Sequence, residues 1–325
     1  MKYFKVLLAI FFYAVFTDFG MSKEVKLDLN AIYGANSFHT EGAVKFAQLV
    51  EKYSGGSVKI TVHPGGSLGF KGPELLKVVK DGQVPMSDIL MGVVAGSESV
   101  FGVSSLPRLV SSYDESRKLY KDFRPIYEKA ATKWNQKFLY AAPWPPSGLV
   151  TKNEVKKVAD LKGLKTRTYD KNGANFLQDL GASSVSMPWG EVYSSLRTGV
   201  IDSVLTSAES TKNGKFWEVL KYFTDIYYAL PLNMVTINLD YWKSLTKEQQ
   251  DAILRAAKEV EASQWQDSEK RHKDSLRVIA ENGMIVNGET PELKAAMDTS
   301  AKKIIAEFQA TLKESDKKVF DKYVK

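Results

Sequence analysis

Residues 160–206 read DLKGLKTRTYDKNGANFLQDLGASSVSMPWGEVYSSLRTGVIDSVLT and alternate between strand and helix patterns. The spacing of apolar residues predicts strands at 164–169, 184–187 and 200–206, and helices at 174–180 and 191–197. Gly181 and Gly199 directly follow the two helical segments, as is typical of helix ends. Strands that alternate with helices form a largely parallel sheet covered by helices. This stretch therefore predicts an α/β lobe.

The same alternation occurs near the start of the chain, which predicts a second lobe. Strands are expected at 25–33 and 58–62, and helices at 40–53 and 73–80. A chain of 325 residues also exceeds the size of one typical hydrophobic core. The segment AAPWPPSG at 141–148 is rich in proline, and we expect the chain to cross between the lobes there. A second crossing is expected near 230–233.

A long helix is expected to contact both lobes. Thr246 and Gln249 form a capping-box pattern, and helical spacing continues until Asn282 and Gly283. At about 1.5 Å per residue, a helix of roughly 35 residues is about 50 Å long. One or two further helices are expected over 292–319. We expect lobe I to comprise 23–147 with about 232–265, and lobe II to comprise 148–231 with about 266–325.

The N-terminus has the composition of a secretory signal peptide. Residues 1–5 include two lysines, residues 6–16 form an uninterrupted run of eleven apolar residues, and Gly20 and Ser22 precede the expected cleavage point. Eleven apolar residues are too few to span a bilayer, which needs about 20. We therefore expect residues 1–22 to be a signal peptide and the mature protein to be periplasmic.

Composition and charge exclude several classes of function. The formal charge of +7 falls to +6 when Lys2, Lys5 and Asp18 leave with the signal peptide, and basic residues alternate with acidic ones. No nucleic-acid partner is expected from this pattern. The absence of cysteine excludes thiol catalysis and cysteine-ligated metals. Three widely spaced histidines and no phosphate-binding glycine motif predict no metal site and no cofactor. No apolar stripe marks an interface, so a monomer is expected.

One enzymatic alternative deserves a test against the sequence. The segment GGSLG at 65–69 matches the G-x-S-x-G nucleophile elbow and lies between a strand and a helix. A hydrolase with the order Ser, acid, His would have to use His272, because His39 and His63 precede Ser67. His272 lies in a charged segment of the long helix and is expected on a solvated face. A glycine turn that closes a strand is the interpretation we favour.

Arg167 is the residue best suited to hold a ligand. A loop, a turn at Gly163 and a short strand bring its guanidinium to the end of a strand. A planar cation at such a place can grip a carboxylate through two parallel hydrogen bonds. Trp144 and Trp189 lie in loops next to proline or glycine, where core packing is less favourable. A cleft with a central arginine and aromatic walls would select an organic acid with an apolar or aromatic group.

A set of short motifs, spread over roughly 25–260, occurs in a fixed order. They are FA at 46–47, VE at 50–51, SGG at 54–56, HPGGSLG at 63–69, LP at 106–107, DLKGLKTR at 160–167, LGA at 180–182, PWGEVY at 188–193, GVID at 199–202, WEV at 217–219 and KY at 221–222. This set resembles the periplasmic substrate-binding subunit of TRAP (tripartite ATP-independent periplasmic) transporters, the DctP-like family. The resemblance implies an α/β, two-lobe periplasmic binding protein, type II-like, with a hinge cleft and a long helix spanning both lobes.

The resemblance also implies a function without catalysis. Such a protein captures a small organic acid and delivers it to the membrane subunits of a TRAP transporter. The arginine of the K-G-L-K-x-R segment pairs with the ligand carboxylate in that family, which implies this role for Arg167. The aromatic residue two before the E-V-Y segment lines the cleft, which implies that role for Trp189. A ligand-sensing adaptor for a membrane receptor would use the same cleft, and the sequence leaves that alternative open.

Three departures from the family pattern bear on the ligand. No second arginine precedes TKN at 151–153, DSVLTS at 202–207 lacks the Gln-Glu-Asn of relatives, and IYY at 226–228 replaces Thr-Asn-His. One carboxylate anchor with more aromatic lining favours a monocarboxylate, such as an aromatic or oxo/hydroxy acid, over a dicarboxylate or sialic acid. The candidate ligand-binding residues are Arg167, Trp189, Trp144, Phe38, Tyr193, Thr206, Ser207, Asn233 and Tyr228.

Overall fold

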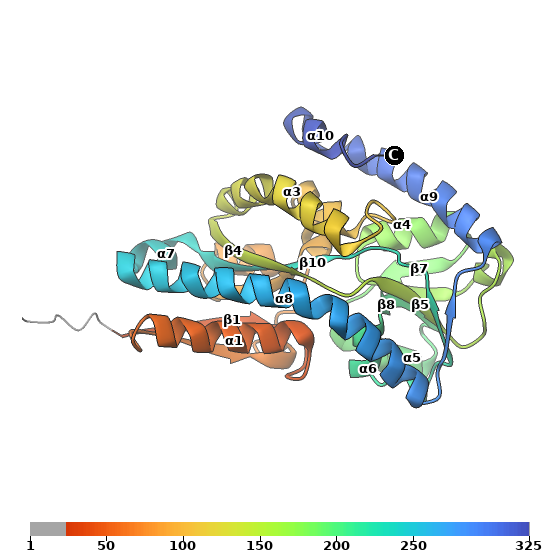
Figure 1. Ribbon diagram of the computed structural model, residues 1–325, viewed down its shortest axis with the longest axis horizontal. Helices are drawn as coiled ribbons and strands as arrows, with labels where there is room; N and C mark the ends of the chain where they lie inside the picture. The colour runs from red at the N-terminus through yellow and green to blue at the C-terminus, as the bar shows by residue number, and fades with distance from the viewer. Residues whose placement is uncertain (1–23, 325) are drawn as a thin grey trace, which may run out of the picture.

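The structure, a computed structural model, describes residues 24–324. The expected signal peptide at 1–22 lies outside the described residues. Two separate mixed sheets, each covered by helices, form two lobes (Figure 1). This arrangement confirms the predicted α/β fold with two lobes.

The first sheet has the strand order β2-β1-β3-β10-β4. Its strands are β1 (Val25–Ala31), β2 (Val58–His63), β3 (Met86–Leu90), β4 (Gln136–Pro143) and β10 (Leu232–Asn238). Strand β1 pairs in parallel with β2 and β3, whereas β10 runs antiparallel to β3 and β4. Four helices contact this sheet: α1 (Phe38–Tyr53), α2 (Leu75–Lys80), α3 (Tyr113–Lys133) and α7 (Leu239–Ser244).

The second sheet has the order β11-β9-β5-β8-β6-β7. Its strands are β5 (Ser147–Thr151), β6 (Lys165–Thr168), β7 (Ser183–Ser186), β8 (Ser203–Ser207), β9 (Tyr222–Asp225) and β11 (Ile285–Gly288). The associated helices are α4 (Lys171–Asp179), α5 (Val192–Thr198) and α6 (Ala208–Asn213). Strand β8 begins three residues later than expected. Gly199 ends α5 with a left-handed φ of 74°, and Ile201 N still donates back to Ser195 O of this helix at 3.3 Å.

Helix α8 (Lys247–Glu281) contacts both lobes, as the sequence predicts. Its capping box is formed, since Thr246 Oγ1 accepts from Gln249 N at 3.3 Å and Gln249 Oε1 accepts from Thr246 N at 3.1 Å. Ile253 and Val260 are buried in a core cluster of the first lobe, and Ile279 is buried in a cluster of the second. Figure 1 shows this helix running along the molecule beside α1 and on towards α5 and α6.

The chain passes between the sheets from β4 to β5 and returns from β9 to β10. The two crossing segments bond to each other: Trp144 N donates to Pro231 O at 2.9 Å, and Ser147 N donates to Ala229 O at 3.0 Å. Tyr228 N donates back to Ser147 O at 2.8 Å. These bonds form a short double-stranded connection, where a hinge between the lobes is expected.

The C-terminal helices α9 (Pro291–Gln309) and α10 (Glu314–Phe320) pack on different lobes. Helix α9 contacts α4, whereas α10 contacts α3, where Phe320 packs edge to face against Phe123 with ring centroids 6.5 Å apart. The division into 23–147 with 232–265 and 148–231 with 266–325 remains a proposal, which the two sheet crossings support. Within it, α10 is a segment of the second part that returns to the first lobe.

Candidate ligand-binding site

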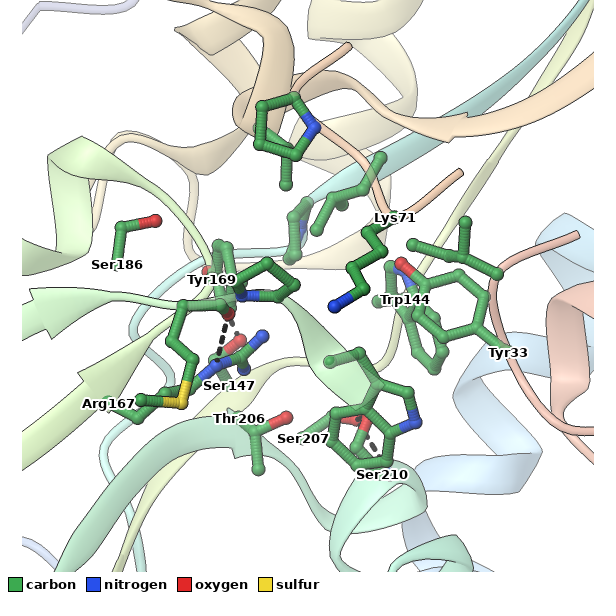
Figure 2. Close-up of a pocket in the computed structure, with 18 residues that line it drawn as sticks. Tyr33, Lys71, Trp144, Ser147, Arg167, Tyr169, Ser186, Thr206, Ser207 and Ser210 are labelled. Atoms are coloured by element: carbon green, nitrogen blue, oxygen red, sulfur yellow. Dashed lines mark hydrogen bonds between the residues drawn. The ribbon is translucent and has the colours of Figure 1, made fainter. Parts of the chain in front are cut away.

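A cavity lies between the lobes, next to the two crossing segments (Figure 2). Its empty space measures about 660 Å³, including a part that opens to solvent. The first lobe contributes Ile32, Tyr33, Lys71, Pro73, Leu90, Val93 and Trp144 to the lining. The second lobe contributes Ser147, Arg167, Tyr169, Ser186, Met187, Pro188, Trp189, Thr206, Ser207 and Ser210, and Pro231 comes from the return crossing.

Arg167 reaches this cavity from β6, where it lies between Val185 of β7 and Val204 of β8. Only 3% of its surface is exposed, and its Nε donates to the carbonyl oxygen of Met187 at 2.9 Å. Among residues 24–324, no carboxylate oxygen lies within 4.0 Å of its side-chain nitrogens. The guanidinium carbon lies 5.9 Å from the centre of the Trp189 ring. The predicted anchor is therefore a buried cation that faces the cavity without an ion-pair partner in the described chain.

Burial lowers the pKa of Arg167 to about 10, because the cation has lost water that no carboxylate replaces. The group still carries its proton at neutral pH. An unpaired buried charge is costly, and a ligand carboxylate would supply the missing partner. The carboxylate of Asp170, beyond ion-pair distance, offsets part of this cost.

Aromatic side chains of the first lobe form the wall opposite Arg167, as Figure 2 shows for Tyr33 and Trp144. The two rings meet edge to face with centroids 4.9 Å apart, and the ring of His39 lies 4.3 Å from that of Trp144. Burial among these rings lowers the pKa of His39 to about 3. A neutral, apolar wall of this kind suits the hydrocarbon part of a small acid.

Small hydroxyl side chains of the second lobe add to the polar lining: Ser147, Ser186, Thr206, Ser207 and Ser210. Ser207 is the N-cap of α6, and its Oγ accepts from Ser210 N at 3.1 Å. Ser147 Oγ and the hydroxyl of Tyr169 lie 3.3 Å apart. Each hydroxyl can donate or accept, so these groups can adapt to a ligand with a mixture of polar atoms.

Five of the nine candidate residues come together in this cavity: Arg167, Trp189, Trp144, Thr206 and Ser207. Tyr193 lines a second hollow, which adjoins the cavity and shares Tyr33, Trp144, Trp189 and Ser210 with it. Tyr193 therefore lines the adjoining hollow and not the cavity itself.

Phe38, Asn233 and Tyr228 do not line the cavity, contrary to the expectation from the sequence. Phe38 is 2% exposed and packs beneath the guanidinium of Arg271. Tyr228 is fully buried, with its hydroxyl donating to Ser105 O at 3.1 Å. Asn233 lies behind Trp144 and accepts from its Nε1 at 2.7 Å. Core packing and buried hydrogen bonds therefore hold these three side chains away from the cavity.

Sequence reasoning missed Tyr33, Lys71, Ser147, Tyr169, Ser186 and Ser210, which line the cavity. A signal was present for Tyr169, which is two residues after Arg167 and so shares its face of an extended chain. Ser147 lies in the predicted crossing. Tyr33 and Lys71 come from the other lobe, and no local pattern connects them to Arg167.

The arrangement required by a serine hydrolase is not present among the described residues. Ser67 is exposed and makes no hydrogen bond to a histidine of the described chain. His63 Nε2 instead lies 2.7 Å from Asp28 Oδ1. His272, expected on a solvated face, is largely covered, with a side chain 12% exposed and 3.3 Å from Asp225. The glycine segment is therefore a turn, as we favoured.

Comparison with known proteins identifies the family. Residues 29–312 match the family described as bacterial extracellular solute-binding protein, family 7, or DctP. The chain belongs to this family. It is a TRAP solute-binding protein, and proteins of this family bind solutes without catalysing a reaction. Among the described residues, no helix is both long enough and apolar enough to cross a membrane.

Three relatives illustrate the match. The protein YiiZ of Salmonella typhimurium is 31% identical over 252 residues, which cover 73% of this chain and 75% of YiiZ. A TRAP solute-binding protein from an unidentified marine microbe, specific for pyroglutamate, has a TM-score of 0.89 and 31% identity, covering 93% of this chain and 99% of its own. DctP6 of Bordetella pertussis, an extracytoplasmic solute receptor binding pyroglutamic acid, has a TM-score of 0.89 and 32% identity, with coverages of 92% and 99%.

Proposed function

We propose that this TRAP solute-binding protein captures a small monocarboxylate through Arg167 in the periplasm and delivers it to TRAP membrane subunits. The observation that carries the proposal is the state of Arg167, a cation that is 3% exposed, faces the cavity and has no carboxylate partner within residues 24–324. Structural arginines in a core are normally paired, so an unpaired one in a cleft points to an anionic ligand. The family implies the membrane partner.

Closure of the lobes would strengthen this contact. A guanidinium presents parallel N–H groups that match the two oxygens of a carboxylate, and the attraction grows as water leaves the cleft. Because Arg167 belongs to one lobe and the aromatic wall to the other, a ligand that touches both favours the closed form.

Pyroglutamate is the ligand that the relatives favour, since two proteins more than 30% identical to this chain are described as binding it. Its chemistry fits the lining. It has one carboxylate for Arg167, a compact ring for the wall of Tyr33 and Trp144, and an amide that hydroxyl groups can bond. Aromatic acids and oxo or hydroxy acids share the first two features and belong in the same screen.

Isothermal titration calorimetry with pyroglutamate tests the proposal. We expect Arg167→Ala to weaken binding by about a hundredfold or more, and Arg167→Lys to lose most of the affinity because the paired N–H geometry is gone. Arg197→Ala is the matched control, because Arg197 is exposed on α5 and does not line the cavity. Unchanged binding by Arg167→Ala would refute the assignment of the anchor.

A further inference from the structure

The glycine segment at 65–69 leads into a loop whose function is unexplained by the carboxylate anchor. Gly69 and Gly72 have φ values of 87° and 148°, which a residue with a side chain rarely adopts. Between them, Lys71 lines the cavity, and Figure 2 shows its side chain extending into that space. A hydrogen bond to Glu74 restrains the loop, because Lys71 N donates to Glu74 Oε1 at 2.6 Å. The glycines thus permit a path that brings one lysine over the cleft.

Lys71 is also held from the opposite lobe. Its Nζ lies 3.0 Å from Oε1 of Glu191, which directly precedes α5 and is two residues after Trp189. The two side chains are 63% and 47% exposed. Ion pairs this exposed contribute little to stability, but they do restrict the direction of a long side chain. An ammonium group has three donors, and within residues 24–324 the Nζ bonds to Glu191 alone, which leaves donors for a ligand.

We propose that Lys71 donates a hydrogen bond to a second acceptor oxygen of the bound acid, and that Glu191 is the positioning residue that aims it. The proposal rests on the proposed function and narrows its ligand class. Arg167 of the second lobe takes the carboxylate, whereas Lys71 of the first lobe takes a carbonyl or hydroxyl oxygen elsewhere on the molecule. The site therefore selects small acids that carry such an oxygen over acids of the same shape that lack it.

Two matched pairs of acids test this selectivity by calorimetry. Pyroglutamate is compared with cyclopentanecarboxylate, and 4-methyl-2-oxopentanoate with 4-methylpentanoate, so that within each pair only one member carries an oxygen beyond the carboxylate. We expect the unsubstituted protein to prefer the oxygen-bearing acid in at least one pair. Lys71→Met is expected to weaken the binding of that acid by about tenfold. The binding of the other acid of the pair should weaken by less than twofold. Tenfold is the low end for a hydrogen bond from a charged donor, since Lys71 is more than half exposed.

Further variants separate a hydrogen-bond donor from a simple clasp between the lobes. Glu191→Gln should weaken the binding of the oxygen-bearing acid less than Lys71→Met does, because the ammonium group of Lys71 remains. The exchange Lys71→Glu with Glu191→Lys should not restore binding, whereas a simple clasp would be restored by it. Lys77→Met is the matched control, because Lys77 of α2 pairs with Asp81 at the end of this helix and does not line the cavity.

Several results would overturn the proposal. They are an equal loss for both members of a pair in Lys71→Met, no loss for either, or full restoration by the charge exchange. If one of these results occurs while Arg167→Ala abolishes binding, the proposed function stands and the role of Lys71 alone fails. If Arg167→Ala binds normally, the proposed function fails. Absence of binding by all four acids would contradict both.

Discussion

The indole Nε1 of Trp144 donates a hydrogen bond of 2.7 Å to Oδ1 of Asn233. Trp144 lies on the outgoing crossing between the lobes, and Asn233 lies at the start of β10, just after the return crossing. The Nδ2 of Asn233 in turn donates to Oδ1 of Asp88 at 2.8 Å, and all three residues are buried. This relay holds the aromatic wall of the cavity against the first sheet.

Replacing Asn233 is expected to destabilise the protein. Asn233→Ala removes two buried hydrogen bonds and leaves both the Trp144 indole and the Asp88 carboxyl without a partner, so we expect a loss of about 2–4 kcal/mol in the free energy of unfolding. Urea denaturation measures it. Asn282→Ala is the control, since its exposed amide donates to Val278 O at the end of α8 and its loss should cost less than about 1 kcal/mol. Equal losses of stability in the two variants would contradict a stabilising role of the buried relay.

Stability should depend on pH through Asp88. Burial raises the pKa of this carboxyl to about 7, whereas the unfolded value is about 3.9. Between these values the folded protein keeps a proton that the unfolded chain has lost, so Asp88 contributes stability at low pH that disappears as the pH rises through 7. Relative to Asp88→Asn, the parent protein should gain about 2 kcal/mol between pH 7.5 and 5.5. A pH-independent difference between the two urea curves would contradict this.

The long helix carries an ion bridge between the lobes. Arg271 pairs with Glu41 of α1 and lies 3.2 Å from Glu209 of α6, whose side chain is fully buried. Burial opposes ionisation of Glu209, but hydrogen bonds from Lys212 and Ser275 and the charge of Arg271 leave its pKa below the usual value.

We expect Arg271→Met to lower the free energy of unfolding by about 1–3 kcal/mol, because Glu209 keeps Lys212 and Ser275 but loses one charged partner. Denaturation at neutral pH measures the change. The variant Arg277→Met is the comparison, since Arg277 pairs with Glu281 on the exposed face of α8 and should cost less than about 1 kcal/mol. If both variants lowered the free energy of unfolding equally, the bridge would contribute no more than an exposed ion pair.

Local signals allowed much of the fold to be predicted from the sequence. The capping box at Thr246 and the glycine at 199 each act over a few residues, so the bounds of α8 and the end of α5 follow from them. Strands β3 and β10 are different, because every residue in them is buried. Without alternation between polar and apolar residues, their pattern does not distinguish a strand from a buried helix.

The site divides in the same way. Arg167 lies on β6 and Tyr169 directly follows this strand, so the sequence contains their relationship. Lys71 and Tyr33 reach the cavity only because two sheets separated along the chain face each other, and this depends on tertiary packing. Phe38 and Tyr228 show the converse, since a position near a loop end does not determine whether a ring faces a cleft or a core.

Removal of the anchor should stabilise the empty protein. Arg167→Met replaces a buried, unpaired cation by an apolar side chain, so we expect the free energy of unfolding without ligand to stay equal or rise by about 1–2 kcal/mol. At the same time, the rise in melting temperature that pyroglutamate gives the parent should vanish. Thermal unfolding with and without the acid measures both effects. A marked loss of stability in the ligand-free variant would indicate a structural role for Arg167 instead.

The most direct test of the central claim is a crystal structure of the protein with its acid bound. We predict that both carboxylate oxygens lie within hydrogen-bond distance of the Arg167 guanidinium, in the cavity bounded by Tyr33, Trp144 and Trp189. A carboxylate found elsewhere, for example beside Lys212 or Lys215 in the adjoining hollow, with Arg167 still unpaired, would contradict the account.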